Sequence, residues 1–295
     1  MKRATDKRRR LREGMAADRP LVLLGAHDAM SARLVEAAGF EAVWVSGFGV
    51  STMEHALPDL NLITMSEALA AGKRIDDACE LPVVADVDNG YGGLVNVVRT
   101  VVEYDRAGLA GVCIEDNLFP KRNSLFQGEA KRELIPRDEQ ARRLAAAKRA
   151  QESPEFTMIA RVESLIAGHG IPDACDRAEA YASAGADAVL IHSKERTGLE
   201  IRGFLEAWQK RDCPIPLVCV PTLFPDFTAE ELHELGFQMV IWANQLMRAS
   251  VQAMEQTLEI LRRERKVAAA DPSIASVNHI FELAKTQETI ALEEE

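Results

Sequence analysis

The sequence is poor in the features that mark secreted, membrane-spanning and thiolate-metal proteins. Its five cysteines are scattered and form no Cys-x-x-Cys pair, which is typical of reduced, mostly buried cysteines in a cytoplasmic protein. No stretch approaches the roughly 18 to 20 unbroken apolar residues of a membrane span. No apolar signal-peptide core follows the first residues. We therefore expect a cytoplasmic protein that binds no membrane.

Positive charge is also scarce, except at one end of the chain. The 35 Lys and Arg residues face 46 Asp and Glu residues, and the formal net charge of −11 argues against a nucleic-acid partner. Residues 1–19 nevertheless hold a basic cluster and are predicted to form a basic N-terminal helix. This helix is either a targeting or polyanion-binding arm, or a solvated helix that leads into Leu11 and Met15.

What the chain does contain is a regular alternation of two patterns. Short β-branched or apolar runs occur at 21–25, 42–46, 83–87, 111–115, 157–162, 187–191, 217–220 and 239–242. Stretches with helical spacing occur at 28–38, 66–78, 94–107, 138–151, 173–184, 200–210, 229–235 and 246–264. Strands that alternate with helices need crossover connections and so form a parallel sheet. Eight such units in 295 residues predict a single α/β domain, a (β/α)8 barrel of the TIM type.

Polar side chains gather at one end of the predicted strands. The following lie at or just beyond a strand's carboxyl end: His27, Asp28, Ser46, Asp86, Asp88, Glu115, Arg161, Glu163, His192, Thr222 and Asn244. That face of a (β/α)8 barrel carries the active site. The connections 47–63 and 116–136 are unusually long and are predicted lids over this face.

A helical extension at 265–295 follows the last barrel unit. Asp271-Pro272-Ser273 breaks the pattern, and a short amphipathic segment follows it. Because a barrel does not need this additional apolar helix, we expect it to pack against a partner subunit.

Three acids are candidates for a metal site. Asp86 and Asp88 are two residues apart and point the same way on an extended strand, and Glu115 ends the next strand. Oxygen ligands without His or Cys spacing favour Mg2+, or Mn2+, over Zn2+. In the alternative interpretation, one acid caps the Gly-rich turn that follows and the other pairs with an arginine.

Several other residues suit an anionic substrate. Arg161 would bind carboxylate or phosphate, or else form a buried ion pair with Glu163. His192 is either a substrate ligand or a satisfied core histidine. The Ser46 hydroxyl and the backbone N–H groups beyond it would hold a carboxylate.

In these segments the chain resembles the phosphoenolpyruvate mutase branch of the isocitrate lyase superfamily. The resemblance runs from about residue 26 to residue 291, and its most specific parts are 26–33, 44–47, 86–92, 115–125, 159–163, 191–194, 220–222 and 240–244. It implies a barrel whose last helix is swapped between subunits, in a homotetramer built as a dimer of helix-swapped dimers. It also implies Mg2+ held by Asp86 and, partly through water, by Asp88 and Glu115.

The resemblance assigns roles to further residues. Phosphoryl and carboxylate binders map onto Ser46, the Gly47 and Phe48 backbone, Arg161 and His192. A central carboxylate near the migrating phosphoryl group maps onto Asp59. The gating loop, with catalytic and binding positions, maps onto Lys121, Asn123, Ser124 and Leu125.

The superfamily divides at this gating loop. Lyases that break C–C bonds carry a cysteine where this chain has Asn123, so a 2-methylisocitrate-type lyase is disfavoured. Phosphonopyruvate hydrolases resemble Thr-Ser-Leu at the positions of Asn123, Ser124 and Leu125. The resemblance therefore implies a small-molecule isomerase of phosphonate biosynthesis that interconverts phosphoenolpyruvate and phosphonopyruvate. The alternative is hydrolysis of phosphonopyruvate to pyruvate and phosphate. Asn117, Asn89 and Gly93 depart from the usual lysine, threonine and asparagine of the mutase pattern.

Overall fold

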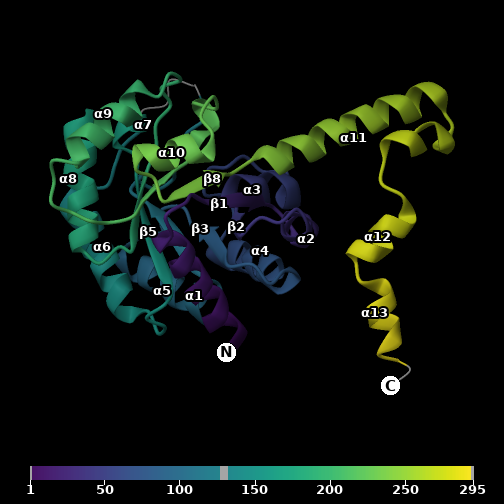
Figure 1. Cartoon of the computed structure of the whole chain (residues 1–295), viewed down its shortest axis with the longest axis horizontal. Coiled ribbons are helices and arrows are strands. Elements are labelled where there is room, and N and C mark those ends of the chain that lie inside the picture. Colours follow the sequence, from purple (N-terminus) through teal and green to yellow (C-terminus); the bar gives the residue numbers. More distant parts are fainter. Residues whose placement is uncertain (1, 127–131, 294–295) are drawn as a thin grey trace.

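The strands close into a barrel in their order along the chain (Figure 1). The computed structural model describes residues 2–126 and 132–293, so part of the predicted lid 116–136 lies outside the described residues. The strands are β1 (Leu21–Ala26), β2 (Ala42–Val45), β3 (Val83–Asp86), β4 (Gly111–Glu115), β5 (Thr157–Val162), β6 (Ala188–Ile191), β7 (Leu217–Cys219) and β8 (Met239–Trp242). Each is parallel to its neighbours, and β8 pairs with β1. The predicted (β/α)8 barrel is confirmed.

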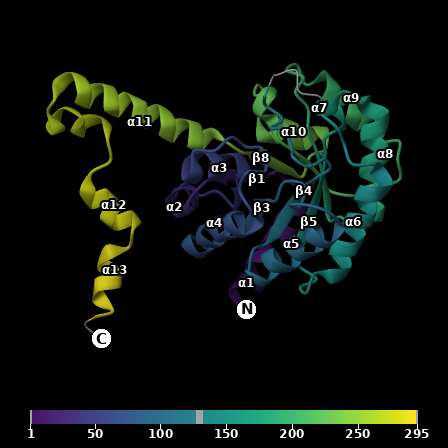
Figure 2. The same cartoon turned by 180° about the vertical axis from the view of Figure 1, so that it is seen from behind.

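Helices surround this sheet on its outer side, as Figure 2 shows from behind. In chain order they are α2 (Ala29–Ala37), α3 (Gly47–His55), α4 (Met65–Ala78), α5 (Leu94–Arg106), α6 (Arg137–Ala150), α7 (Ser164–Ala167), α8 (Gly170–Ser183), α9 (Leu199–Trp208) and α10 (Ala229–Leu235). Their apolar faces pack on the outward-facing residues of the strands. A second, separate cluster of apolar side chains fills the inside of the barrel.

The first helix, α1 (Lys2–Ala16), closes the amino end of the barrel. Leu11 and Met15 pack into the inner cluster of the barrel. Lys7 Nζ lies 2.7 Å from Asp76 Oδ1, and Arg8 Nη2 lies 2.9 Å from Asp105 Oδ1. Lys7 and Arg8 are buried. The expectation of a solvated helix is therefore wrong for these two residues, because Asp76 of α4 and Asp105 of α5 pair with their charges and backbone carbonyls accept their hydrogen bonds.

The carboxyl-terminal part of the chain extends away from the barrel. Helix α11 (Gln245–Glu264) projects away from the sheet (Figure 1). The helices α12 (Val277–Leu283) and α13 (Thr286–Ala291) follow it as an arm, which meets the rest of the subunit where Arg33 of α2 donates to the Leu283 carbonyl. Among the described residues of α11, Met247 alone is buried. The 246–264 pattern correctly predicted a helix, but only the start of this helix packs on its own barrel, through Leu246 and Met247.

The structure bears on two further expectations. All five cysteines are free, and all but Cys213 are buried. No helix in the described part of the chain has the length and hydropathy that a membrane crossing requires.

Candidate functional site

Side-chain alternation along the strands carries polar residues to one mouth of the barrel. Residues two apart on a strand point to the same side. In β2 to β6, a residue of the inner apolar cluster is followed two positions later by a polar residue. These pairs are Trp44 and Ser46, Val84 and Asp86, Cys113 and Glu115, Ile159 and Arg161, and Leu190 and His192. The mouth of the barrel is therefore polar above an apolar interior.

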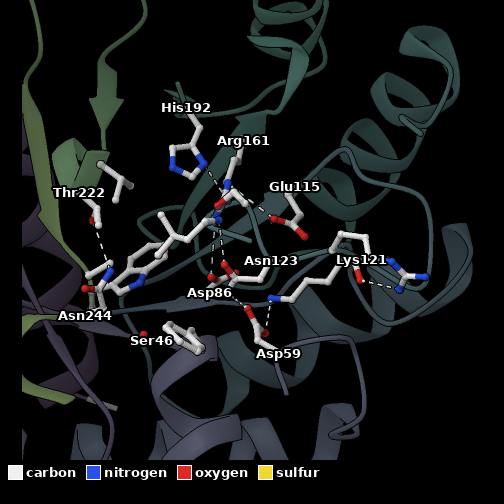
Figure 3. A pocket seen from close by; sticks show the side chains of 17 residues that line it. Ser46, Asp59, Asp86, Glu115, Lys121, Asn123, Arg161, His192, Thr222 and Asn244 are labelled. Carbon is white, nitrogen blue, oxygen red and sulfur yellow. Dashed lines mark hydrogen bonds and ion pairs between the residues drawn. The ribbon is translucent and has the colours of Figure 1, made fainter. Parts of the chain in front are cut away.

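These side chains line a pocket together with residues of two loops (Figure 3). Its lining comprises Trp44, Ser46, Phe48, Asp59, Asp86, Glu115, Lys121, Arg122, Asn123, Ser124, Leu125, Arg161, His192, Val220, Thr222, Ala243 and Asn244. The free space at the centre is about 50 Å³, room for a few water molecules. Of the predicted site residues, Gly47 and Asp88 lie beside this lining rather than on it. The Gly47 Cα faces the Asp88 carboxylate, since an added Cβ would lie 3.4 Å from Asp88 Oδ1.

The amino end of α3 faces the pocket. Ser46 is its N-cap, and the Ser46 Oγ accepts a hydrogen bond from the Gly49 N–H at 3.1 Å. Ser46 and Phe48 both lie on the pocket lining. Free N–H groups and the helix dipole at such an end suit a carboxylate or phosphate. The expectation of a lid over all of 47–63 is wrong in its first half, because this N-cap starts a helix directly after β2.

Arg161 forms the buried ion pair with Glu163, and it also lines the pocket. Its Nε donates to Glu163 Oε1 at 2.6 Å, and its Nη2 lies 2.9 Å from His192 Nδ1. Glu163 Oε1 also lies 3.0 Å from His192 Nδ1. His192 Nε2 is buried without a hydrogen-bond partner among the described residues. Glu163 therefore orients Arg161 and His192, and both still line the pocket.

The electrostatics of this group follow from its burial and its charges. Burial alone would raise the pKa of Glu163, but Arg161 and His192 hold that pKa well below its usual range. Burial, with the Arg161 charge beside it, lowers the pKa of His192. This lowered pKa favours the neutral form of His192, whose Nδ1 is directed to Arg161 and Glu163.

Asp59 lies in the connection from α3 to α4 and contacts the predicted gating loop. Lys121 Nζ lies 2.7 Å from Asp59 Oδ1, and Asn123 Nδ2 donates to Asp59 Oδ2 at 2.7 Å. Figure 3 shows Lys121 and Asn123 directed at Asp59. The Ser124 Oγ in turn accepts from Arg161 Nη2 at 3.2 Å. The loop thus contacts Asp59 on one side of the pocket and Arg161 on the other.

The three predicted metal ligands lie at this end of the barrel, and each has a cationic neighbour. Arg161 Nη1 lies 3.9 Å from Asp86 Oδ2, and Arg161 Nε lies 3.6 Å from Glu115 Oε2. Asp88 forms an ion pair with Lys121. Asp86 Oδ1 accepts from the Asp88 N–H at 3.1 Å. Asp86 therefore has both a contact in the turn that follows it and an arginine neighbour. This agrees in part with the alternative interpretation, in which the acids cap the turn and pair with an arginine. Within the described residues, no three His, Cys, Asp or Glu side chains are grouped so as to hold an ion.

The chemistry of the acids nevertheless fits a hard divalent cation. Glu115 Oε1 is buried and accepts no hydrogen bond from the described residues. Burial raises the pKa of Glu115 against the opposing effect of Arg161, and burial raises the pKa of Asp88 against the effect of Lys121. Both Arg161 distances exceed hydrogen-bond length, so Arg161 compensates the carboxylates of Asp86 and Glu115 only incompletely. Carboxylate oxygens of this kind are the ligands that Mg2+ prefers.

Sequence reasoning assigned no role to two residues that the structure places at the site. Asn61 donates from Nδ2 to Asp88 Oδ2 at 2.7 Å, and its Oδ1 accepts from the Lys121 N–H at 2.6 Å. Its φ of +57° is a conformation that asparagine tolerates better than most residues. Trp44 lines the pocket. Its position two residues before Ser46 was a usable signal, whereas nothing in the sequence distinguished Asn61.

Comparisons with known proteins agree with this geometry. The profile of the phosphoenolpyruvate phosphomutase family matches residues 11–262. The chain is 37% identical to a phosphoenolpyruvate phosphomutase of Tetrahymena pyriformis over 261 residues, which make up 88% of this chain and 85% of that protein.

Two crystal structures are similar over nearly the whole chain. A phosphoenolpyruvate phosphomutase from Streptomyces platensis subsp. rosaceus has a TM-score of 0.93 and 41% identity, covering 97% of this chain and 98% of that one. A phosphonopyruvate hydrolase in complex with oxalate and Mg2+ has a TM-score of 0.90 and 36% identity, covering 98% of both chains. Sequence, fold and site thus lead to one assignment: the chain belongs to the phosphoenolpyruvate phosphomutase family.

Proposed function

We propose that this protein is a phosphoenolpyruvate mutase, an isomerase that moves a phosphoryl group between oxygen and carbon within one substrate. In phosphonopyruvate the P–C bond would break, and a P–O bond to the enolate oxygen would form. The observation that carries this proposal is the contact of Asn123 with Asp59 in a loop that also reaches Arg161 through Ser124. A loop fastened in this way excludes water from a pocket in which a free phosphoryl group would otherwise be captured.

Each part of the site has a task in this reaction. The amino end of α3, with Ser46, Gly47 and Phe48, would bind the substrate carboxylate. Arg161 and His192 would donate to the phosphoryl oxygens, since phosphoryl transfer depends mainly on positioning and charge compensation. Lys121 holds its proton, because the neighbouring Asp59 and Asp88 raise the pKa of Lys121 despite its burial. It would balance the charge beside the migrating group.

Asp86, Asp88 and Glu115 would hold Mg2+, with Mn2+ as a substitute. A bound divalent cation would supply positive charge against the oxygens of the pyruvate part of the substrate. Two observations support this assignment: the buried Glu115 oxygen has no hydrogen-bond partner in the described part of the chain, and the related hydrolase is in complex with Mg2+.

Hydrolysis is the second candidate function. The related hydrolase covers as much of the chain as the related mutase does. In the hydrolase reaction water attacks phosphorus as the P–C bond breaks, and the enolate takes up a proton to give pyruvate. Asn123 favours the mutase, because the hydrolase pattern has threonine at that position.

Phosphorus NMR of the purified protein with phosphonopyruvate and Mg2+ distinguishes the two functions. We expect the phosphonate signal to be replaced by that of phosphoenolpyruvate, with little inorganic phosphate. Accumulation of phosphate together with an equal amount of pyruvate would reject the mutase and support the hydrolase. Heat-treated protein is the control for non-enzymatic decay.

We further infer a homotetramer in which the carboxyl-terminal arm contacts a partner subunit. Met254 and Leu258 of α11 are 49% and 65% exposed, and Val277 and Phe281 of α12 are 67% and 51% exposed. Exposed apolar surface of this extent is typical of a subunit interface.

Light scattering coupled to gel filtration tests the assembly. The full chain is expected to show four times the 32.5 kDa of one subunit. Deletion of residues 265–295 removes the exposed apolar side chains of the arm and is expected to lower the measured mass. A full-length chain that elutes with the mass of one subunit would contradict this assembly.

A further inference from the structure

Arg132 lies just beyond the gating loop, and neither the pocket lining nor the sequence motifs include it. Its side chain is only 9% exposed. The guanidinium donates to three backbone carbonyls of the loop: Arg122 O at 3.1 Å, Asn123 O at 2.5 Å and Phe126 O at 3.3 Å. A planar, five-donor guanidinium can serve three acceptors in this way, whereas an ammonium group cannot reproduce the fork.

The same guanidinium faces the carboxylate that orients the phosphoryl binders. Arg132 Nη1 lies 3.9 Å from Glu163 Oε2. That oxygen is buried and accepts no hydrogen bond from the described residues. The other oxygen, Glu163 Oε1, is the one that contacts Arg161 and His192. Arg132 is therefore a cation placed between the loop backbone and the buried Glu163–Arg161–His192 group.

This placement couples two parts of the site. Asn123 and Ser124 line the pocket from the loop backbone that Arg132 contacts, since Arg132 donates to the carbonyl of Asn123 itself. If the loop moves away, Arg132 loses its three carbonyl acceptors. A buried charge without partners is unfavourable, so the closed arrangement is stabilised as a unit.

We propose that Arg132 is a positioning residue that holds the loop 122–126 closed against Glu163 and thereby determines whether the phosphoryl group stays with the substrate or reaches water. This inference rests on the proposed function, because it concerns the product ratio of that reaction. Arg132 touches no reacting atom. Its loss changes the reaction through Asn123 and Ser124, which lose their fixed positions above the pocket.

Replacement of Arg132 by methionine is the principal test, with the full-length protein, phosphonopyruvate and Mg2+. We expect the ratio of pyruvate plus phosphate to phosphoenolpyruvate to rise by about tenfold or more, as the loss of charged hydrogen bonds implies. Arg137→Ala is the matched control, because Arg137 is an exposed arginine five residues along the chain that pairs with Asp138. It should leave the ratio unchanged. A lower rate with an unaltered product ratio would overturn the proposal, since a merely structural residue would behave in that way.

Hydrogen exchange supplies a readout that does not depend on the reaction. In the presence of oxalate and Mg2+, the peptide covering 118–126 should exchange about tenfold faster in Arg132→Met than in the wild type. Unchanged exchange would overturn the proposal. If the wild type itself releases mostly pyruvate and phosphate, the mutase assignment fails, and the exchange result alone decides the role of Arg132.

Arg132→Lys keeps the positive charge beside Glu163 and removes the planar, forked set of N–H donors. We expect a product ratio and an exchange rate between those of the wild type and of Arg132→Met. This variant replaces the methionine variant if circular dichroism shows that the latter does not fold. Full recovery of both wild-type values with lysine would refute the requirement for the three carbonyl contacts.

Discussion

Replacing Asp59 with alanine is expected to lower turnover of phosphonopyruvate by about a thousandfold, the scale on which loss of a central polar group acts in a dry active site. Asp59 is 7% exposed, and its two oxygens contact Lys121 and Asn123. Without it, the Lys121 ammonium loses one of its two carboxylate neighbours, and Asn123 loses the acceptor that fastens the loop. Rates of phosphoenolpyruvate formation, measured by phosphorus NMR, provide the test.

Two measurements separate this effect from unfolding or loss of metal. Calorimetric titration of the Asp59→Ala protein with Mg2+ should give a wild-type affinity, since Asp59 is not among the proposed ligands. Asp77→Ala is a suitable control, because Asp77 is an exposed acid that pairs with Lys73. Near-normal turnover in Asp59→Ala would show that the central role assigned to this carboxylate is wrong.

The second large effect is expected on removal of divalent cations. Treatment with EDTA followed by gel filtration should reduce turnover to the background rate, and added Mg2+ should restore it, with Mn2+ as a substitute. The physical reason is the incompletely compensated negative charge of Asp86 and Glu115, which leaves the pocket unsuited to an anionic substrate until a cation is bound. Turnover at each step is followed in the same NMR assay.

Variants of the acids make the assignment residue-specific. Glu115→Gln keeps the shape of the side chain and removes its charge. It should weaken Mg2+ binding by more than about a hundredfold, because even residues that only support metal ligands contribute 10- to 100-fold. Glu41→Gln is a surface control, since Glu41 pairs with Arg19 far from the pocket. Full activity in chelator-treated wild-type protein would refute the metal requirement.

The barrel and most of the pocket lining could be predicted from the sequence, because both depend on local periodicity. An apolar residue inside the barrel fixes the direction of the residue two positions later, and this rule places Asp86, Glu115, Arg161 and His192 at one mouth. Fold and family are confirmed. The roles of these residues in catalysis and metal binding stay predictions.

Features that depend on contacts between distant segments could not be predicted. Asn61 lies in an irregular loop, and its importance arises from two partners, Asp88 and Lys121, that are far along the chain. Arg132 follows the recognisable loop motif by several residues and has no pattern of its own. The direction of α11 is not encoded in its helical periodicity, which specifies an apolar face but not the surface that covers it.

The floor of the barrel has a practical consequence for handling the protein. Helix α1 packs against the ends where the strands begin, and Arg12 extends this attachment by pairing with Asp187 at 3.0 Å. The substrate pocket opens at the opposite ends of the strands. A dye or solid support linked through the first residues would therefore face away from the substrate entrance. The same group at the carboxyl terminus would be attached to the arm through which subunits are expected to assemble.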